Sequence, residues 1–391
     1  MRKFSSIFMS FVTVCAILAA AVAVIAYGRG YRLDLKKSTL RPTGLISTAS
    51  DPIGAQVFVD NILKTATNNS FGIDPGFYTV RISKEGYIPW EKQIRVQGEV
   101  VSQASAFLFP TNPSLSPITT LGIMHPTLSP DGTKVAYMIP APAGRAGLWY
   151  YELSEGPLGR NRDPIQIDQN STFDFKNARI TWAPDTTQLL VNNSLYTLAK
   201  PNTYTDVTLT KKALLSDWEA TQAETDLQKL AAFKQPIINI ATSSAKIISF
   251  SPDETKILYE ATAAATIPQV IVPPLIGTNS TQEDRNIKPG KLYVYDSHED
   301  KNFFLLDKKE LEKNPAFSQL HWFPTSRHLL LTANAKIDVM EYDRTNWVTI
   351  YSGPFVDDFV APWTNGSRII ILTNLNGDAT TLPNLYTVNL R

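Results

Sequence analysis

A short turn motif that recurs along the chain constrains the fold more than any other feature. Its clearest copy is Pro130-Asp131-Gly132, which lies between Leu128 and a run where Val135 and Tyr137 alternate with other residues. Proline presets the first corner of such a turn, and glycine supplies a left-handed residue. Related turns follow near Pro184, Pro252, Pro324 and Thr364. Each turn leads into an alternating strand and then a second strand, which predicts a repeat of antiparallel units.

Repeats of several strands each predict a β-propeller, because a single unit cannot bury both faces of its own sheet. We expect it over residues 115–391, with five blades and room for a sixth, closed by LYTVNLR (385–391) beside a strand from 117–124. Two long intervals separate the repeats. Residues from about 208 to 236 show helical spacing, ended by Pro236, in Leu214, Trp218, Ala223, Leu227 and Leu230. Residues from about 262 to 290 form a polar, proline-rich loop.

The repeats resemble the Pro-Asp type of WD40-like blade found in the translocation protein TolB and its relatives. The resemblance covers roughly residues 115–391 and is strongest in the copies at Pro130 and Pro252. Propellers commonly contact partners through loops at one face. We therefore expect the insertions at 208–236 and 262–290 to contact a partner.

A second region, residues 44–109, predicts a small antiparallel β-sandwich, because alternating strands are separated by tight turns without a helical segment. It resembles a PEGA domain. The resemblance is carried by Pro52-Ile53-Gly54-Ala55, Asp60, Pro75-Gly76-x-Tyr78 and Lys84-Glu85-Gly86-Tyr87. Ile53 replaces the usual glutamate, and Asn61 stands where glycine is usual. The resemblance implies a surface or envelope protein of bacteria or archaea, and a module without catalytic residues.

The N-terminal region contains an uncharged apolar stretch over residues 7–27, after a short flank at 1–6 and before a linker at 28–43. Its length predicts a transmembrane helix that anchors the chain in a lipid bilayer. A cleaved signal peptide is the alternative, with Ala21-Val22-Ala23 as the cleavage site. Basic residues follow the stretch as well as precede it, so charge alone favours a cytoplasmic C-terminus. The PEGA resemblance instead favours a single-pass membrane protein with an extracytoplasmic body.

Residues typical of catalysis or metal binding are sparse. The four histidines, His125, His298, His321 and His328, form no zinc motif, and Cys15 is the one cysteine. His328 stands at a repeat position that we expect to be a solvated strand start. The segment from Asp168 to Asp174 places oxygen ligands at alternate positions but lacks the glycine and glutamate of a calcium loop. We assign no catalytic, cofactor-binding or metal-binding residue, and no cofactor.

Three functions remain open. Domain order and the lack of a catalytic constellation favour a non-enzymatic binding or scaffold protein of the envelope, whose propeller contacts a protein or glycan. The alternative is an enzyme on polysaccharide or peptidoglycan that uses rim carboxylates such as Asp357-Asp358 or Glu299-Asp300. A third is a purely structural element. Nucleic acid is not expected as a partner, because 37 basic and 36 acidic residues leave a net charge of +1.

Overall fold

The protein is mainly β and divides into two compact units. The computed structural model describes residues 2–28, 31–34, 39–140, 144–156, 162–169, 174–198, 204–309, 320–333, 335–375 and 381–391. The first unit comprises Met1–Leu108 together with Ile271–Gln282, and the second comprises Phe109–Val270 together with Glu283–Arg391. The first unit therefore includes a segment that is remote in sequence from the rest of it.

The N-terminal stretch forms the helix α1 (Arg2–Gly28). It is followed by a two-stranded hairpin of β1 (Tyr31–Asp34) and β2 (Thr39–Pro42). Across the described parts of the chain, no helix combines the length and the apolar character that crossing a bilayer requires. The predicted transmembrane helix over residues 7–27 is therefore wrong.

Two small sheets pack face to face in the first unit. One sheet has the order β6 (Asn69–Ile73), β3 (Gly44–Asp51), β9 (Val101–Phe107), and the other has the order β5 (Ile62–Ala66), β4 (Gln56–Val59), β7 (Gly76–Ser83), β8 (Trp90–Val96). The inward residues of both sheets form one core, which includes Ile46, Val57, Val80 and Ile94. The predicted β-sandwich is confirmed.

Strand pairing in this sandwich departs from the prediction at one place. β3 pairs with β9 in parallel, with Leu45 opposite Val101 and Asp51 opposite Phe107. Parallel neighbours need a long crossover connection, which here is the intervening hairpins of the sandwich. The sequence indicated each strand by its alternation, but alternation carries no information on which remote strand becomes the neighbour.

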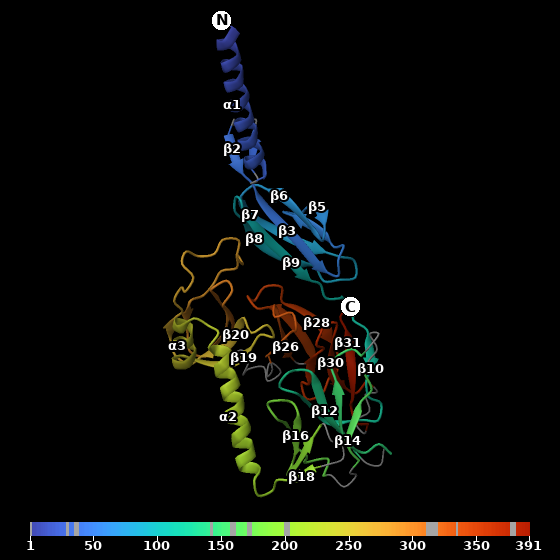
Figure 1. Ribbon diagram of the computed structural model, residues 1–391. Coiled ribbons are helices and arrows are strands. Elements are labelled where there is room, and N and C mark those ends of the chain that lie inside the picture. Colours follow the sequence, from blue (N-terminus) through green and yellow to red (C-terminus); the bar gives the residue numbers. More distant parts are fainter. Residues whose placement is uncertain are drawn as a thin grey trace. The chain divides into compact units, whose positions relative to one another are not determined.

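The second unit contains five four-stranded antiparallel sheets (Figure 1). In chain order, four of them are β11 (Met124–Leu128) to β14 (Ile165–Asp168), β15 (Ile180–Trp182) to β18 (Tyr204–Asp206), the sheet β19-β20-β23-β24, and β25 (Leu320–Trp322) to β28 (Val348–Ser352). Their other strands are β12 (Lys134–Ile139), β13 (Gly147–Glu152), β16 (Gln188–Val191), β17 (Ser194–Thr197), β19 (Ala245–Phe250), β20 (Lys256–Ala261), β23 (Lys291–Asp296), β24 (Lys301–Asp307), β26 (His328–Ala333) and β27 (Lys336–Glu341).

The fifth sheet joins the two ends of this unit. Its order is β10 (Leu115–Pro117), β31 (Asn384–Asn389), β30 (Arg368–Thr373), β29 (Val360–Pro362). Leu115 lies opposite Val388, and the backbone N–H of Ile118 donates to Leu385 at 2.8 Å. The C-terminal strand therefore pairs with an early strand as predicted, although that strand begins slightly before the expected residues 117–124.

Hydrophobic cores are shared between the last and first sheets, the first and second sheets, and the third and fourth sheets. The sheet of β29–β31 packs on that of β11–β14, which packs in turn on that of β15–β18. The sheet of β19–β24 packs on that of β25–β28, whose Phe323 lies against Gly366 of the fifth sheet. This arrangement is that of a β-propeller with five blades in the described residues.

The helical insertion joins the second blade to the third. α2 (Lys211–Leu230) buries Trp218 near one end against the sheet of β15–β18, and Leu230 at its other end against the sheet of β19–β24. Between these ends most residues of the helix are exposed, and Leu227 is 62% exposed. The predicted helix is thus confirmed, but only part of its predicted apolar face is buried.

Pro236 has a different role from the predicted one. α2 ends at Leu230, and Pro236 stands in the first turn of α3 (Gln235–Ser243). Proline suits that position because the first N–H groups of a helix have no intrahelical partner. The loop insertion begins and ends in a short pair of strands, β21 (Ala265–Thr266) and β22 (Asn286–Ile287).

Candidate functional site

The five Pro-Asp-type turns share one geometry, including the two copies whose sequences depart from the motif. In each turn the third residue has a left-handed backbone, with φ between 56° and 70°, in Gly132, Thr186, Glu254, Ser326 and Gly366. Its N–H donates back to the residue three positions earlier, at 2.9 Å from Gly132 to Ser129 and 2.8 Å from Gly366 to Trp363. The repeat therefore depends on backbone geometry, which Thr186, Glu254 and Ser326 adopt at some cost.

Side chains in these turns hold them closed and connect neighbouring blades. The Asp131 carboxylate accepts hydrogen bonds from Ser129 Oγ at 2.6 Å and from the Thr133 N–H at 3.0 Å. Thr186 of the next blade also donates to Asp131, at 3.1 Å. In the same way the backbone N–H of Asp253 donates to Ser326 Oγ at 3.0 Å. The turn aspartate Asp131 therefore stabilises its own turn and connects it to the next blade.

The turns also surround a cavity of about 710 Å³. Its lining comes from four blades and from Lys229 of α2. Each of these blades contributes one proline, namely Pro130, Pro252, Pro324 and Pro362. Leu128, Ile248 and Leu320 add further apolar surface. A volume of this size lies within the range of known ligand sites. The cavity is the candidate functional site.

Two tryptophans at equivalent positions behave differently around this site. Trp182 pairs with Leu189 at the end of β15 and donates its indole N–H to the carbonyl of Thr127 at 3.0 Å. Trp322 pairs with Leu329 in the same register and lines the cavity, but its buried Nε1 has no partner among the described residues. A buried donor without a partner costs about 1–3 kcal/mol.

A second buried polar atom without a partner lies in the same wall. Ser249 Oγ is buried and makes no hydrogen bond to any described residue, and Ser249 lines the cavity with Trp322. The inner strands of the first and third blades have the same register here, because Thr127 lies opposite Ala136 and the equivalent Ser249 lies opposite Leu258. The bulges therefore do not account for the missing partner of Trp322. The sequence did not indicate that Trp322 or Ser249 would lack a partner. The repeated Trp-x-Pro spacing shows only that Trp182 and Trp322 hold equivalent positions.

Charged groups lie at the same cavity, and each has an internal partner. Burial raises the pKa of the Asp131 carboxyl, but hydrogen bonds from Ser129 and Thr133 lower it by more, so the net shift is downward. Asp131 is therefore ionised at neutral pH and is poorly suited to donate a proton. The carboxylate of Glu254 pairs with Lys229 at 3.2 Å.

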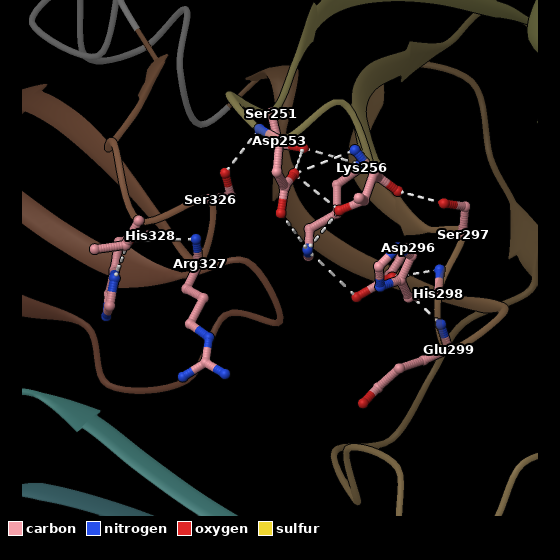
Figure 2. Close-up of polar contacts among 12 residues, drawn as sticks. Ser251, Asp253, Lys256, Asp296, Ser297, His298, Glu299, Ser326, Arg327 and His328 are labelled. Atoms are coloured by element: carbon pink, nitrogen blue, oxygen red, sulfur yellow. Dashed lines mark hydrogen bonds and ion pairs between the residues drawn. The ribbon is translucent and has the colours of Figure 1, made fainter. Parts of the chain in front are cut away.

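Figure 2 shows a polar cluster beside this site, centred on Lys256. Its ammonium lies 3.7 Å from Asp296 and 3.8 Å from Asp253, donates to Thr255 at 3.0 Å, and lies 5.1 Å from the ring centre of Tyr342. Asp296 in turn accepts from the backbone N–H of His298 at 2.9 Å. Lys256 is only 7% exposed, so this pair sits in a region of low dielectric constant.

The prediction that this repeat position is a solvated strand start is wrong for two blades. Lys256 is buried, and His328 at the equivalent position is 3% exposed. The Nδ1 atom of His328 lies 2.9 Å from Thr325 Oγ1, and its ring contacts Phe109 and Phe323 edge to face. Both side chains pack against a neighbouring element, which the pattern within one repeat does not reveal.

The carboxylate pairs proposed for an enzyme are parts of turns. Asp300 is buried, accepts from Tyr295 OH at 3.0 Å and from the Val270 N–H at 2.7 Å, and pairs with Arg285 at 3.4 Å. Asp357 and Asp358 both have left-handed backbones. Neither pair lines the candidate cavity. The predicted absence of catalytic residues remains a prediction.

Metal ligands do not gather in the described part of the chain, where no group of three or more suitable side chains is found. In the segment from Asp168 to Asp174, Asn170 and Thr172 lie outside the described residues. Asp168 accepts from Tyr196 OH at 2.7 Å, and Asp174 accepts from Asn177 at 2.8 Å. The histidines His125 and His321 lie in different surroundings. His125 contacts the carbonyl of Phe175, and His321 lines the cavity.

Protonation of His321 is expected to make the second unit pH-sensitive. Burial lowers its pKa below the usual 6.5, so the unfolded chain binds this proton more readily. The stability that the neutral imidazole contributes is complete above about pH 6.5 and is lost as the pH falls toward the folded pKa. We expect the free energy of unfolding, measured with urea, to fall more between about pH 7.5 and about pH 5.5 for the wild type than for His321→Gln. Equal losses would contradict this role.

Comparison with known proteins identifies one part of the chain. No curated protein matches it. Among solved structures, TolB from Agrobacterium tumefaciens matches with 11% identity and a TM-score of 0.22, covering 68% of this chain and 78% of that one. The WD40 repeats of RRP9 match with 6% identity and a TM-score of 0.29, covering 72% and 99%. These scores are too low to support an argument, so the propeller assignment depends on the sheets themselves. The PEGA domain family matches residues 43–108, and this part of the first unit is a PEGA domain.

Proposed function

We propose that the chain is a binding platform of the cell envelope, and that the turn-lined cavity of its propeller takes an uncharged segment of a partner protein. The observation that carries the proposal is that Trp322 and Ser249, which line a cavity of about 710 Å³, each hold a buried polar atom without a partner among the described residues, Nε1 and Oγ. Backbone carbonyls of a bound segment are suitable acceptors for both groups. The PEGA domain supports the envelope location, as its resemblance implies.

The composition of the cavity wall favours a polypeptide over a glycan. Prolines and aliphatic side chains supply seven of the eighteen lining residues, and Trp322 is only 8% exposed, so its ring faces offer no open stacking surface. A site that combines apolar surface with a few polar groups suits a polypeptide segment, because such a segment offers both apolar side chains and backbone carbonyls. The charged groups Asp131, Glu254 and Lys229 already have internal partners, which favours a segment without charge.

Trp322→Phe and Trp182→Phe provide a matched test, because the two tryptophans occupy equivalent positions. Trp182→Phe removes a hydrogen bond within the fold and is expected to lower stability by about 1 kcal/mol more than Trp322→Phe, which removes a donor without a partner. Binding is expected to show the reverse order. Trp322→Phe should reduce capture of the partner from envelope fractions about tenfold, while Trp182→Phe leaves capture unchanged.

The measurement is affinity capture with the full chain, followed by mass spectrometry, together with urea unfolding of each variant. Loss of capture in proportion to loss of stability, for both variants alike, would contradict the proposal. Capture that depends on Trp322 but yields a polysaccharide rather than a protein would exclude the polypeptide partner.

A further inference from the structure

The loop insertion of the propeller contains a segment that folds with the other unit. Residues 271–282 (IVPPLIGTNSTQ) carry no charge and belong to the first unit together with the PEGA domain. The segment contacts the middle of β8 at Gln93, the following turn and the start of β9. No sequence pattern indicates this contact, because the two parts are far apart along the chain.

Backbone groups of both parts take part in the contact. The N–H of Gly277 donates to the side-chain oxygen of Gln97 at 3.3 Å, and Ser280 Oγ donates to the backbone carbonyl of Gln93. Gly277 has φ +74°, and a Cβ there would lie 2.7 Å from Val100 Cγ1 and 3.2 Å from the carbonyl of Val101. The surface therefore requires glycine at this point for both its backbone conformation and its lack of a side chain.

The apolar side chains of the segment contribute little to this contact. Val272 is 80% exposed and Ile276 is 65% exposed, so burial of apolar surface does not fix the segment in place. The hydrogen bonds of Gly277 and Ser280 contribute about 1 kcal/mol each, and none of residues 271–282 is buried. Elements with so few buried contacts open locally without global unfolding.

The base of the loop is secured independently. β21 pairs with β22, and the N–H of Ile267 donates to the carbonyl of Arg285 at 2.8 Å. Arg285 also pairs with the buried Asp300, whose carboxylate accepts from the N–H of Val270. The segment is thus able to leave the PEGA domain while these contacts of the second unit stay intact.

We propose that the β8–β9 side of the PEGA domain, formed by Gln93, Gln97, Val100 and Val101, is a binding site for an extended, uncharged segment with a glycine at the contact point. Residues 271–282 are its resident ligand. Because this ligand is tethered, its effective concentration is high, and a free segment competes only after the resident one has been displaced. The same segment of a second copy of this chain is the partner that fits the site in trans.

Gly277→Ala and Gly290→Ala test this site in the full chain. Both glycines belong to the loop insertion and have nearly equal φ, +74° and +75°, but a Cβ on Gly290 meets nothing within 4 Å. We expect hydrogen exchange over 271–282 and 97–101 to become about tenfold faster in Gly277→Ala and to stay unchanged in Gly290→Ala. Equal effects of the two variants, or no effect of Gly277→Ala, would overturn the proposal.

A synthetic peptide of residues 271–282 supplies the trans test. It should restore slow exchange over residues 97–101 of Gly277→Ala and leave the wild type unchanged, because the wild-type site is occupied. Failure of the peptide to protect the variant at millimolar concentration would show that the surface is not a binding site. Gln97→Leu, which removes the acceptor without a steric clash, provides the second variant, and it should speed exchange over 271–282 to a smaller extent.

Discussion

Lys256→Ala is expected to lower the free energy of unfolding of the second unit by about 3–5 kcal/mol, because it leaves the buried carboxylate of Asp296 without its cation. Lys256 is 7% exposed, and its ammonium lies 3.7 Å from Asp296. Removing one partner of a buried pair costs more than the pair itself contributes, since the other charge stays in a region of low dielectric constant.

Lys134→Ala is the matched control for this effect. Lys134 holds the same repeat position in the first blade, is half-buried, and donates to Thr133 at 3.4 Å. Its loss is expected to cost below about 1 kcal/mol. Urea unfolding followed by tryptophan fluorescence reports mainly on the second unit, which holds six of the seven tryptophans. Similar costs for the two substitutions would contradict a buried, interacting Lys256.

The double substitution Lys256→Met with Asp296→Asn separates the charge from the packing. It removes both charges and keeps similar side-chain volumes, so it is expected to recover most of the stability that Lys256→Ala loses. The amide oxygen of the new asparagine still accepts from the backbone N–H of His298. A double variant as unstable as Lys256→Ala would show that packing, and not the unpaired carboxylate, causes the loss.

Trp363→Ala is the second substitution with a large expected effect, about 3–5 kcal/mol. Trp363 is fully buried in the core that the last blade shares with the first, and Arg368 lies 4.4 Å above its ring. The cavity left by alanine would open the contact that closes the ring of blades. Differential scanning calorimetry of the full chain should show this loss in the transition of the second unit.

Trp363→Phe is the control for ring closure. The buried Nε1 of Trp363 makes no hydrogen bond to a described residue, so phenylalanine loses ring volume and some cation–π attraction but no hydrogen bond. Its expected cost is about 1–1.5 kcal/mol. If Trp363→Ala cost no more than Trp363→Phe, the shared core of the first and last blades would not be what closes the propeller.

Much of the architecture was predictable from local sequence patterns. The turns at Pro130, Pro184 and Pro252 carry their own backbone preferences, so their positions indicated the blades directly. The strands of the PEGA domain and the helix α2 followed from alternation and helical spacing in the same way. The closing pair of β10 and β31 was also predictable, because a ring requires the last strand to find an early one.

The remaining features depend on neighbours that one repeat does not specify. Lys256 and Lys134 hold the same repeat position, yet only Lys256 has Asp296 and Tyr342 beside it. Trp182 finds an acceptor in the preceding blade, whereas Trp322 has none among the described residues. These differences arise from contacts across blades, and alternation along one strand carries no record of them.

Site-specific crosslinking in intact cells tests the binding role of the cavity most directly. A photoreactive phenylalanine at Pro324, which lines the cavity, is expected to form a covalent adduct with one partner polypeptide, and Trp322→Phe should reduce that adduct about tenfold. The same group at the exposed Asn365, whose side chain contacts Glu155, is the positional control and should give no such adduct. An adduct from Pro324 that persists undiminished in Trp322→Phe, or one that forms equally from Asn365, would contradict a partner segment bound in the cavity.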